Sequence, residues 1–386
     1  MDYARRERVV KDLSWAKVAS EIFNNEVFVM FSRFLKNIIF LTLPSFFILF
    51  IGLELFFRFV IPASEKPIAY FDEENSLLRS DEKKRTEGTY TIGKFAKIRA
   101  KWRTNNYGWN SAIDYHPNAS SDKKLISIIG DSFVRALQVD VDKNFAALLR
   151  NKLPNEYEVY SFGHDGAPLS QYLHMSRYVN KYFKPHILVF LLIHNDFDES
   201  VVQFHSTPYF LQLNMENSNG KIDEVRPTKQ NFYQFLTYSA IFRYLYSNHG
   251  YIAQLYFGGK QNYNANVDVD FILKKQATVK KATNILIKKI KDENTDKRII
   301  FLMDAPRNDI YSNKLPESNV IWMNEMVRQI SQYHHLELID LTNSFYNNYT
   351  KKNKKFNSEL DFHWDEYGHS IVSDVLYQNL TDVVQP

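Results

Sequence analysis

The chain has 386 residues, of which 45% are hydrophobic and 24% charged, a balance typical of globular proteins that excludes a disordered chain. Its 48 basic and 44 acidic residues give a net charge of +4, which is too small to indicate a nucleic-acid-binding protein. The absence of cysteine excludes disulfides, thiolate metal sites and a cysteine nucleophile.

An apolar run near the N-terminus predicts a membrane-spanning helix. Residues 37–53 carry no charge, and the apolar character continues to residue 61, which gives the ~20 residues needed to cross a bilayer. Glu54 and Arg58 are four residues apart and can pair on one helix face at the headgroup level. A contact with a partner's membrane helix is the alternative for this pair. A cleavable signal peptide is disfavoured because the run is too long and begins after residue 36.

Basic residues near the ends of this run predict its orientation, because cytoplasmic flanks carry an excess of Lys and Arg. Lys17, Arg33 and Lys36 precede the run, whereas Lys66 and Arg79 follow it. We therefore expect the N-terminus in the cytoplasm and everything after residue 61 in the periplasm or outside the cell.

These patterns divide the chain into four expected parts. They are an N-terminal cytoplasmic arm (1–36), a transmembrane helix (37–61), a stalk with a short packed prelude (62–120) and an α/β domain (121–386) with an insertion at about 200–296. Within the prelude, Asn-Tyr-Gly-Trp (106–109) suggests a turn with an aromatic side chain packed underneath.

Five short apolar runs beyond residue 120 predict buried parallel strands. They are residues 125–130, 157–163, 187–193, 298–304 and 336–341. Stretches with helical spacing lie between them, at 144–153, near 170–183, near 270–292 and at 320–333. This alternation predicts a flavodoxin-like three-layer sandwich, in which helices cover both faces of a five-stranded parallel sheet.

About 100 residues separate the third and fourth predicted strands, too many for a simple crossover. Residues 233–246 within this insertion have helical spacing, and we expect a helix there beside the active face. The sequence shows no internal repeat.

Polar clusters follow the predicted strands at the edge where open parallel sheets place their sites. The clusters are Gly130-Asp131-Ser132, Gly163-His164-Asp165-Gly166, His194-Asn195-Asp196 and, near the C-terminus, Asp361-Phe362-His363-Trp364. Because the carboxyl ends of parallel strands meet at one edge, we expect all four clusters to converge there.

The residue types in these clusters are those of acyl transfer. A serine hydroxyl becomes a good nucleophile when a histidine takes its proton and a carboxylate holds that histidine. Ser132 just past the first strand can be the nucleophile, His363 the general base and Asp361 its orienting carboxylate. The tetrahedral oxyanion also needs fixed donors, which the backbone N–H groups of Ser132 and Gly166 and the side-chain amide of Asn195 can supply. A glycine at 166 is expected because a backbone close to substrate leaves no room for a Cβ.

This set resembles the SGNH (GDSL-type) hydrolase superfamily over about residues 125–200 and 335–380. GDSF (130–133) matches the block that holds the nucleophilic serine, SFGHDG (161–166) the block whose last glycine gives an oxyanion N–H, and IHND (193–196) the block with the oxyanion asparagine. The third block has Ile193 where glycine is usual. DFHWDEYGH (361–369) matches the last block, with Asp and His two residues apart where three is usual. This form, and the NNYGWNS stretch (105–111), look like those of membrane-linked, exopolysaccharide-modifying members.

Each motif also has a structural explanation on its own. Gly-Asp-Ser is a common helix N-cap, Asn195-Asp196 a common strand-end turn, and Asp361 with His363 a common surface pair. The decisive feature is their order and their placement after strands. Glu359 and Asp365 are the nearby carboxylates that can replace Asp361 as the orienting group.

Other polar residues have plainer explanations. His164 and His194 can line the pocket but lack a third metal ligand at useful spacing, so no metal is expected. His369 suits a cap or a packing role at a helix start. The lysine run 351–355 fits a solvated loop better than an anionic-glycan contact.

The sequence therefore suggests a membrane-anchored serine esterase that needs no cofactor. The resemblance, together with membrane tethering, implies acyl groups on an envelope or secreted carbohydrate as substrate. An O-acyltransferase is the first alternative; one transmembrane helix cannot carry an activated acyl group across a membrane, so it requires a multi-spanning partner or an external donor. A non-catalytic component of polysaccharide assembly is the second alternative.

Overall fold

The computed structural model describes residues 3–117, 123–216, 222–230, 237–248 and 263–381. The chain forms two compact units, Met1–Pro62 and Ala63–Pro386.

The first unit is helical from Tyr3 to Phe59, and its last three residues are not helical. Helix α1 (Tyr3–Asn37) passes through a π-helical turn, η1 (Ile38–Thr42), into α2 (Leu43–Phe59). The π-helical turn precedes Pro44, whose ring would collide with the carbonyl group four residues earlier in a regular helix, and the wider turn accommodates it. The expected arm over residues 1–36 is thus helical in its described part. No Gly or Pro occurs in the first 43 residues to interrupt the helix.

In the described part of the chain, one helix is long and apolar enough to cross a membrane. It comprises Ser14–Phe59, and its most apolar window has a mean hydropathy of 2.3. Glu54 and Arg58 pair as expected, with Arg58 Nη2 2.6 Å from Glu54 Oε1.

The second unit is built around a five-stranded parallel sheet. Its strands are β5 (Lys124–Gly130), β6 (Tyr157–Gly163), β7 (Ile187–Leu192), β12 (Arg298–Met303) and β13 (Glu337–Asp340). They lie in the order β13-β12-β7-β5-β6, and every neighbouring pair is parallel. Counted in chain order this is 2-1-3-4-5, the flavodoxin-like arrangement. The five predicted strands are confirmed to within two residues at each end.

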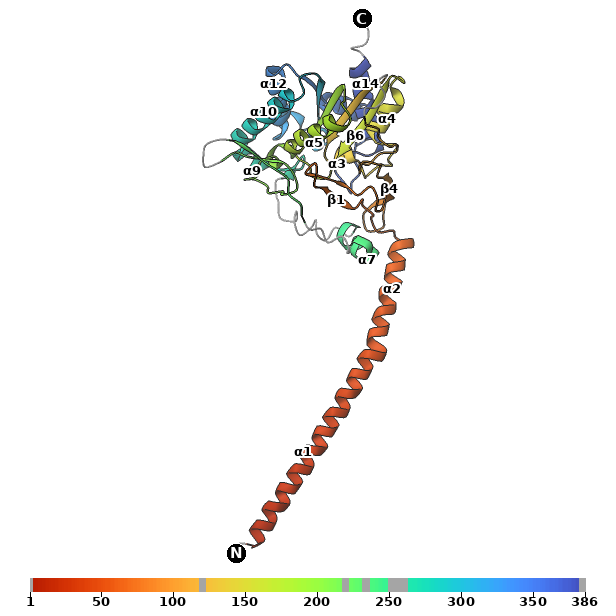
Figure 1. Cartoon of the computed structure of the whole chain (residues 1–386), viewed down its shortest axis with the longest axis vertical. Helices are drawn as coiled ribbons and strands as arrows, with labels where there is room; N and C mark the ends of the chain where they lie inside the picture. The colour runs from red at the N-terminus through yellow and green to blue at the C-terminus, as the bar shows by residue number, and fades with distance from the viewer. Residues whose placement is uncertain (1–2, 118–122, 217–221, 231–236, 249–262, 382–386) are drawn as a thin grey trace. The chain divides into compact units, whose positions relative to one another are not determined.

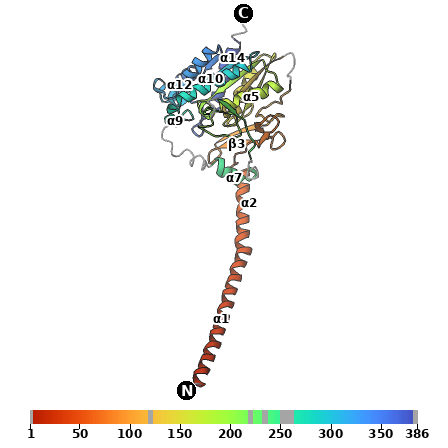
Figure 2. The same cartoon turned by 60° about the vertical axis from the view of Figure 1, so that its left-hand side comes forward.

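Helices cover both faces of this sheet (Figures 1 and 2). One face packs against α5 (Leu169–Tyr182), α10 (Gln276–Asp292) and α12 (Ile321–Tyr333), and the other against α4 (Phe145–Lys152), α13 (Thr342–Lys352) and α14 (Glu366–Thr381). Side chains alternate along β5, so that Ile129 faces the first layer and Ile128 the second. Both faces are buried, which explains why the strands are nearly continuous apolar runs. The three-layer prediction is confirmed.

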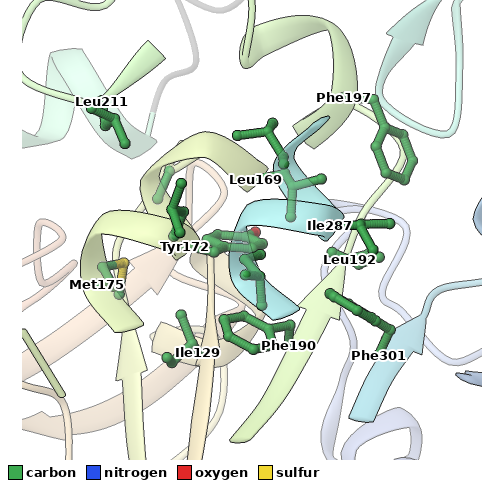
Figure 3. Close-up of a cluster of buried hydrophobic side chains, with 14 of the residues drawn as sticks. Ile129, Leu169, Tyr172, Met175, Phe190, Leu192, Phe197, Leu211, Ile287 and Phe301 are labelled. Carbon is green, nitrogen blue, oxygen red and sulfur yellow. The ribbon is translucent and has the colours of Figure 1, made fainter. Parts of the chain in front are cut away.

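Figure 3 shows the core beneath the first helical layer. Tyr172 and Leu169 of α5 and Ile287 of α10 point toward Phe190 of β7 and Phe301 of β12. The rings of Phe190 and Phe301 lie 5.5 Å apart. These side chains are fully buried, and each large apolar group removed from water stabilises the domain by about 1.5–3 kcal/mol.

The expected stalk is replaced by packed structure from residue 63 onward. Two antiparallel hairpins, β1 (Ala69–Asp72) with β2 (Leu77–Ser80) and β3 (Glu87–Ile92) with β4 (Ile98–Arg103), belong to the second unit. Ala63 is 2% exposed, and the indole N–H of Trp102 donates to the carbonyl oxygen of Glu65 at 2.8 Å. Charged side chains in this region suggested a solvated linker, but the apolar residues between them are buried.

The turn predicted at Asn-Tyr-Gly-Trp is confirmed. Gly108 has φ +80°, and its N–H donates to the carbonyl oxygen of Asn105 at 3.0 Å. Only glycine suits this position, because a Cβ there would lie 2.3 Å from the carbonyl oxygen of Ser80. Trp109 is 1% exposed and meets the ring of Phe162 edge-on at 5.3 Å.

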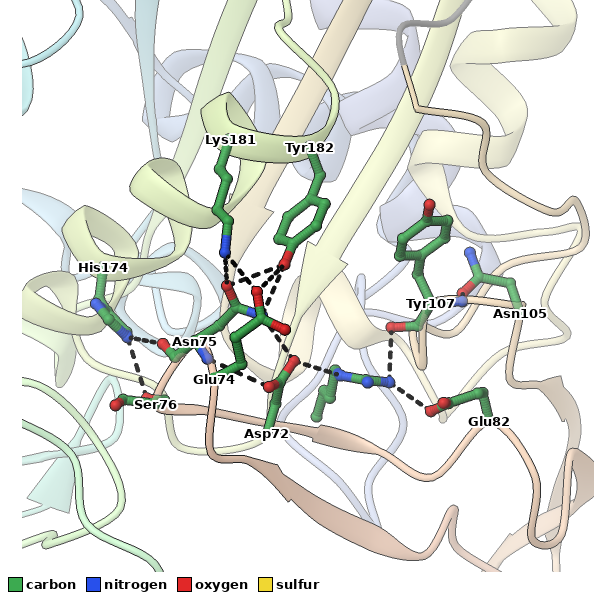
Figure 4. A network of polar contacts seen from close by, with 11 residues as sticks. Asp72, Glu74, Asn75, Ser76, Glu82, Asn105, Tyr107, His174, Lys181 and Tyr182 are labelled. Carbon is green, nitrogen blue, oxygen red and sulfur yellow. Dashed lines mark hydrogen bonds and ion pairs between the residues drawn. The ribbon is translucent and has the colours of Figure 1, made fainter.

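A polar network tethers the β1–β2 hairpin to α5 (Figure 4). Lys181 of α5 donates to Glu74 at 2.9 Å, and His174 contacts the carbonyl oxygen of Asn75 at 3.0 Å. Asp72 accepts from Asn75 at 2.9 Å and from Arg79 at 3.4 Å. A hollow of about 690 Å³ lies here, but these lining groups already bind one another, so it is not the candidate active site.

In its described residues, the expected insertion at about 200–296 consists of short elements that precede the long helix α10. They are β8 (Gln212–Asn214), β9 (Asp223–Val225), α7 (Ala240–Arg243), the π-helical η3 (Tyr244–Asn248), β10 (Tyr263–Asn264), β11 (Val267–Asp268) and α9 (Val269–Lys274). The helix expected at 233–246 lies partly outside the described residues. Its described part, α7 with η3, contacts the β3–β4 hairpin, where Asn248 Nδ2 donates to Thr91 Oγ1 at 2.8 Å.

Candidate active site

Ser132 lies immediately beyond the carboxyl end of β5 and opens a single helical turn, α3 (Ser132–Arg135). Asp131 caps this turn by accepting the N–H of Phe133 at 2.9 Å, and Ala136 ends it with φ +50°. Asp131 is therefore the N-cap that the motif alone suggested. A helix of four residues has a small dipole and contributes little to the stabilisation of negative charge.

The structure brings Ser132, His363 and Asp361 together in one relay. His363 Nε2 lies 2.7 Å from Ser132 Oγ, and His363 Nδ1 lies 2.6 Å from Asp361 Oδ1. Asp361 Oδ1 also accepts the backbone N–H of His363 at 3.1 Å. The Asp-x-His spacing of two is thus sufficient, because a tight turn lets one carboxylate oxygen contact both the imidazole and the backbone.

Aromatic rings hold the imidazole of His363 in place. The Phe133 ring lies 4.7 Å from it, and the Phe362 ring stacks on it at 4.3 Å. Phe133 is 1% exposed whereas Phe362 is 47% exposed, so one ring anchors the relay in the core and the other borders solvent.

The electrostatics of Asp361 favour its role as the partner of a cation. Burial alone would raise the pKa of this carboxyl, but the charge and hydrogen bonds of His363 outweigh burial and hold it below its ordinary value. An ionised Asp361 can stabilise the imidazolium that forms when His363 takes a proton.

Asp365 and Glu359, the two alternatives to Asp361 as the orienting carboxylate, have different environments. Asp365 Oδ1 accepts the N–H of Gly368 at 2.9 Å and so caps α14, while Glu359 is exposed. Asp361 is the carboxylate that contacts His363.

Gly163 and Gly166 of the second cluster are required for different structural reasons. Gly166 has φ +70°, and a Cβ built there would meet no protein atom within 4 Å. Its left-handed backbone, not crowding by protein atoms, therefore requires glycine. Crowding occurs at Gly163 instead, where a Cβ would lie 2.2 Å from the backbone nitrogen of Arg135. Gly163 thus lets β6 approach the turn that carries Ser132.

Asn195 follows β7, the strand beside β5, and is 4% exposed. Its side chain hydrogen-bonds Glu199, and burial raises the pKa of Glu199 to about 7. An amide nitrogen carries two N–H groups, so Asn195 can donate to Glu199 and to a second acceptor. Ile193, at the position where glycine is usual, is buried in the core beneath β7.

Two carboxylic acids that follow the strands β5 and β7, Asp131 and Asp196, are buried. Asp196 Oδ2 accepts the N–H of Ile193 at 2.7 Å and the hydroxyl of Tyr172 at 2.8 Å. Burial raises the pKa of both Asp196 and Asp131. Ser132 Oγ lies 3.3 Å from Asp131 Oδ2.

The fourth strand contributes a group that sequence reasoning missed. After β12 come Asp304, 1% exposed, and Arg307, the first residue of α11 (Arg307–Tyr311). Arg307 donates to the carbonyl oxygen of Phe362 at 2.6 Å and lies 3.2 Å from Asp304, and its guanidinium sits 5.2 Å from the Phe133 ring centre. Asp304 also accepts from the Trp364 indole at 3.3 Å. Their position directly after a predicted strand is the one sequence signal for this pair.

Three other histidines singled out in the sequence, His194, His369 and His164, lie outside the relay. His194 is 1% exposed and contacts Asn324 of α12 at 2.9 Å, so it does not line the pocket. His369 Nδ1 accepts the N–H of Phe145 at 3.2 Å, which bears out a packing role. Burial, reinforced by Arg135, lowers the pKa of His164 to about 4. In the described ranges, no group of three His, Asp or Glu side chains could hold a metal ion.

A cleft of about 780 Å³ adjoins the loop that carries the relay. Its wall is made of aromatic, amide and basic side chains together with the loop itself: Tyr263, Asn266, Asn308, Tyr311, Lys355 and residues 357–362. Tyr311 also ties the loop to α11, because its hydroxyl donates to Asn357 Oδ1 at 2.7 Å.

No protein-family model and no curated protein sequence matches the chain. Solved structures that match include a member of the lipolytic G-D-S-L family from Veillonella parvula DSM 2008 (13% identity, 67% of this chain and 98% of that one, TM-score 0.39). Another is the acetyl xylan esterase AlAXEase (13% identity, 66% of this chain and 99% of that one, TM-score 0.38). A third is a two-domain esterase active on acetylated mannans (12% identity, 68% of this chain and 50% of that one, TM-score 0.37).

The G-D-S-L name among these structures is the one that the sequence motifs predicted. The fold of the chain is assigned from the strand order of its own sheet.

Proposed function

We propose that the chain is a serine esterase of the SGNH type that works through an acyl-serine intermediate. The observation that carries this proposal is the relay from Ser132 through His363 to Asp361, with contacts of 2.7 and 2.6 Å. Ser132 and His363 are 231 positions apart in the sequence, so the fold, and not a local turn, creates their contact.

The first half of the reaction acylates Ser132. His363 Nε2 takes the hydroxyl proton while Oγ attacks the carbonyl carbon of the ester, and Asp361 stabilises the resulting imidazolium. The backbone N–H groups of Ser132 and Gly166 and the amide of Asn195 would hydrogen-bond the tetrahedral oxyanion. When the intermediate collapses, the imidazolium gives its proton to the departing alcohol oxygen, and the acyl group stays on Oγ.

The second half differs between an esterase and an O-acyltransferase. In an esterase, His363 takes a proton from water while the oxygen of that water attacks the acyl carbonyl carbon. When the bond to Oγ breaks, the imidazolium returns its proton to Ser132 Oγ and the carboxylic acid leaves. In an O-acyltransferase, a sugar hydroxyl takes the place of that water. A non-catalytic assembly component has no need of a hydrogen-bonded relay, so the contacts favour an enzyme.

Acyl esters of an envelope or secreted carbohydrate, with acetyl as the acyl group, are the proposed substrates. The cleft beside the relay offers tyrosines Tyr263 and Tyr311, amides such as Asn266, and Lys355. Aromatic faces and amide groups suit the apolar faces and hydroxyl groups of a sugar. An acetylated xylan and an acetylated mannan are the kinds of substrate named for two of the similar structures.

The apolar run of residues 37–61, most of which lies in the helix Ser14–Phe59, is proposed as a single membrane anchor, with the N-terminus inside and the catalytic unit in the periplasm or outside the cell. More basic residues before the apolar run than after it support this orientation. A protease added to intact or outer-membrane-permeabilised cells should remove a C-terminal tag. A tag that stays protected until the inner membrane is lysed would reverse the orientation.

Hydrolysis of short aryl esters tests the proposed chemistry. Ser132→Ala should abolish hydrolysis above the uncatalysed rate while leaving the circular dichroism spectrum unchanged. Ser127→Ala, a buried serine of β5 outside the relay, is the matched control and should retain activity. A Ser132→Ala enzyme that keeps its rate would remove the nucleophile from the proposal.

A further inference from the structure

An aromatic and basic surface lies where the chain enters the folded unit. We define the aromatic face as Phe95, Phe242, Leu245 and Tyr246, which are 69%, 38%, 53% and 53% exposed. Phe95 lies in the turn between β3 and β4, and the other three lie in α7 and η3. Lys94, Lys97 and Arg99 beside Phe95 are also exposed.

Hydrogen bonds join the two segments of this face. The hydroxyl of Tyr244 donates to the carbonyl oxygen of Lys94 at 2.9 Å, and Asn248 Nδ2 donates to Thr91 Oγ1 at 2.8 Å. The rings of Phe242 and Tyr246 are stacked, with an interplanar angle of 15°. The aromatic face is therefore a built surface of neighbouring segments and not a set of isolated apolar residues.

The same segments bind Ser64, which follows the apolar helix by a few residues. Asn248 Oδ1 accepts the N–H of Ser64 at 2.8 Å, and Ser64 Oγ accepts the N–H of Thr91 at 3.1 Å. Helix α2 ends at Phe59. Five residues of extended chain span at most about 18 Å, so a helix end at a bilayer surface keeps Ser64 within that distance of the surface.

We propose that the aromatic face and its flanking lysines dock in the headgroup region of the bilayer. This inference rests on the proposed membrane anchor. Aromatic side chains beside Lys and Arg are the residues that settle at a membrane interface, the rings at headgroup depth and the cations against anionic lipids. The covalent link at residues 59–64 brings the surface there without a separate binding step.

Docking would place the loop of residues 357–363, which carries Asp361 and His363, beside the membrane. Leu360 in this loop is the neighbour of the β3–β4 turn, because a Cβ built on Gly93 would lie 3.0 Å from Leu360 Cδ1. Leu360 and Phe362 are 46% and 47% exposed. An acyl donor or a lipid-linked substrate moving in the bilayer plane would thus reach Asp361 and His363 without crossing open solvent.

Single cysteines test the docking directly, because the native chain has none. Full-length Phe95→Cys and Leu245→Cys, labelled with a polarity-sensitive fluorophore, would be reconstituted in phosphatidylcholine–phosphatidylglycerol vesicles. Tyr333→Cys, at the end of α12 and 77% exposed, is the matched control, and Phe50→Cys within α2 monitors the anchor. Nitroxide-bearing lipids should quench the labels at 95, 245 and 50 but not the label at 333.

The outcomes separate docking from anchoring and from catalysis. Suppose that lipid nitroxides quench the label at 50 while only a water-soluble nitroxide quenches the labels at 95 and 245. That result would overturn docking and keep the anchor. A label at 50 that lipid does not quench would overturn both. If lipid nitroxides quench the label at 95 only when a second membrane protein is added to the vesicles, docking on lipid is overturned and the aromatic face binds a protein partner instead. Lys94→Gln with Lys97→Gln should reduce quenching at 95 in anionic but not in zwitterionic vesicles, and ester hydrolysis measured alongside reports the esterase proposal independently.

Discussion

His363 is held by contacts of three kinds: a carboxylate at Nδ1, a hydroxyl at Nε2 and aromatic rings on its faces. Arg307 fixes the same loop from outside by binding the carbonyl oxygen of Phe362. The imidazole therefore needs little reorganisation before it accepts a proton, which is the condition for efficient general-base catalysis.

Replacing Asp361 should lower kcat more than it changes KM. In Asp361→Asn, an amide N–H facing Nδ1 favours the tautomer whose Nε2 carries the proton and cannot accept another. The loss should reach up to about 10⁴-fold in the hydrolysis of an aryl ester. Glu359→Gln, two residues away on the same exposed loop, is the control and should keep the wild-type rate. If Glu359→Gln lost activity and Asp361→Asn kept the wild-type rate, Glu359 would be the orienting carboxylate instead.

Asn195→Ala should cost on the order of 10²–10³ in kcat, as expected when one oxyanion donor is lost. The substitution also removes a hydrogen bond to Glu199. Glu199→Gln separates the two effects, because it changes that partner and leaves the Asn195 amide in place. Steady-state kinetics of both variants decide the role: equal losses would make Asn195 a packing residue rather than a donor to substrate.

At the scale of elements, the contact between α4 and α14 makes stability depend on pH. His369 in the first turn of α14 is 1% exposed, and burial lowers its pKa to about 3 from an ordinary 6.5. The unfolded chain therefore binds more protons than the folded chain between these values. Stability from this group is complete above pH 6.5 and is lost as the pH falls toward 3.

The expected loss is about 2 kcal/mol between pH 6.5 and pH 5, at ~1.4 kcal/mol per pH unit. His369→Gln keeps an acceptor for the Phe145 N–H but has no proton to gain, so urea midpoints should depend less on pH in this variant. His116→Gln, at an exposed histidine, is the control and should behave as wild type. A pH dependence unchanged in His369→Gln would mean that other groups cause the acid lability.

The elements themselves were largely predictable from sequence, for physical reasons. A parallel strand buried on both faces is a continuous apolar run, so β5, β6, β7, β12 and β13 were visible. Helix α13 was not predicted, because its polar sequence, TNSFYNNYTKK, buries only Thr342 and Phe345. The β1–β2 and β3–β4 hairpins were hidden by charged residues that pair with one another, as Arg79 does with Glu82.

The site was predictable where motifs mark it and hidden where tertiary contacts make it. Ser132 stands at a marked strand end, Asp361 and His363 lie in the motif-bearing loop between α13 and α14, and the three meet as expected. Arg307 carries no motif, and its partners lie in three separate segments. The left-handed backbone at Gly166 was not foreseen, because a sequence does not reveal a positive φ, and the close approach of substrate to this glycine stays a prediction.

On the scale of the whole molecule, the unit that carries the chemistry begins at Ala63. Ala63 is buried, and Ser64 bonds to Asn248 and Thr91. A truncated chain should therefore begin at Pro62, just ahead of these contacts. Such a chain lacks the apolar helix and is expected to be soluble and folded.

Covalent trapping of Ser132 in this truncated chain tests the central claim most directly. An aryl phosphonate mimics the tetrahedral intermediate and reacts with a serine that a histidine activates. Peptide mass spectrometry should find one phosphonyl group, on Ser132, and none in Ser132→Ala; labelling should be much slower in His363→Ala. A folded wild-type chain that stays unlabelled, or that is labelled on another residue, would contradict the account.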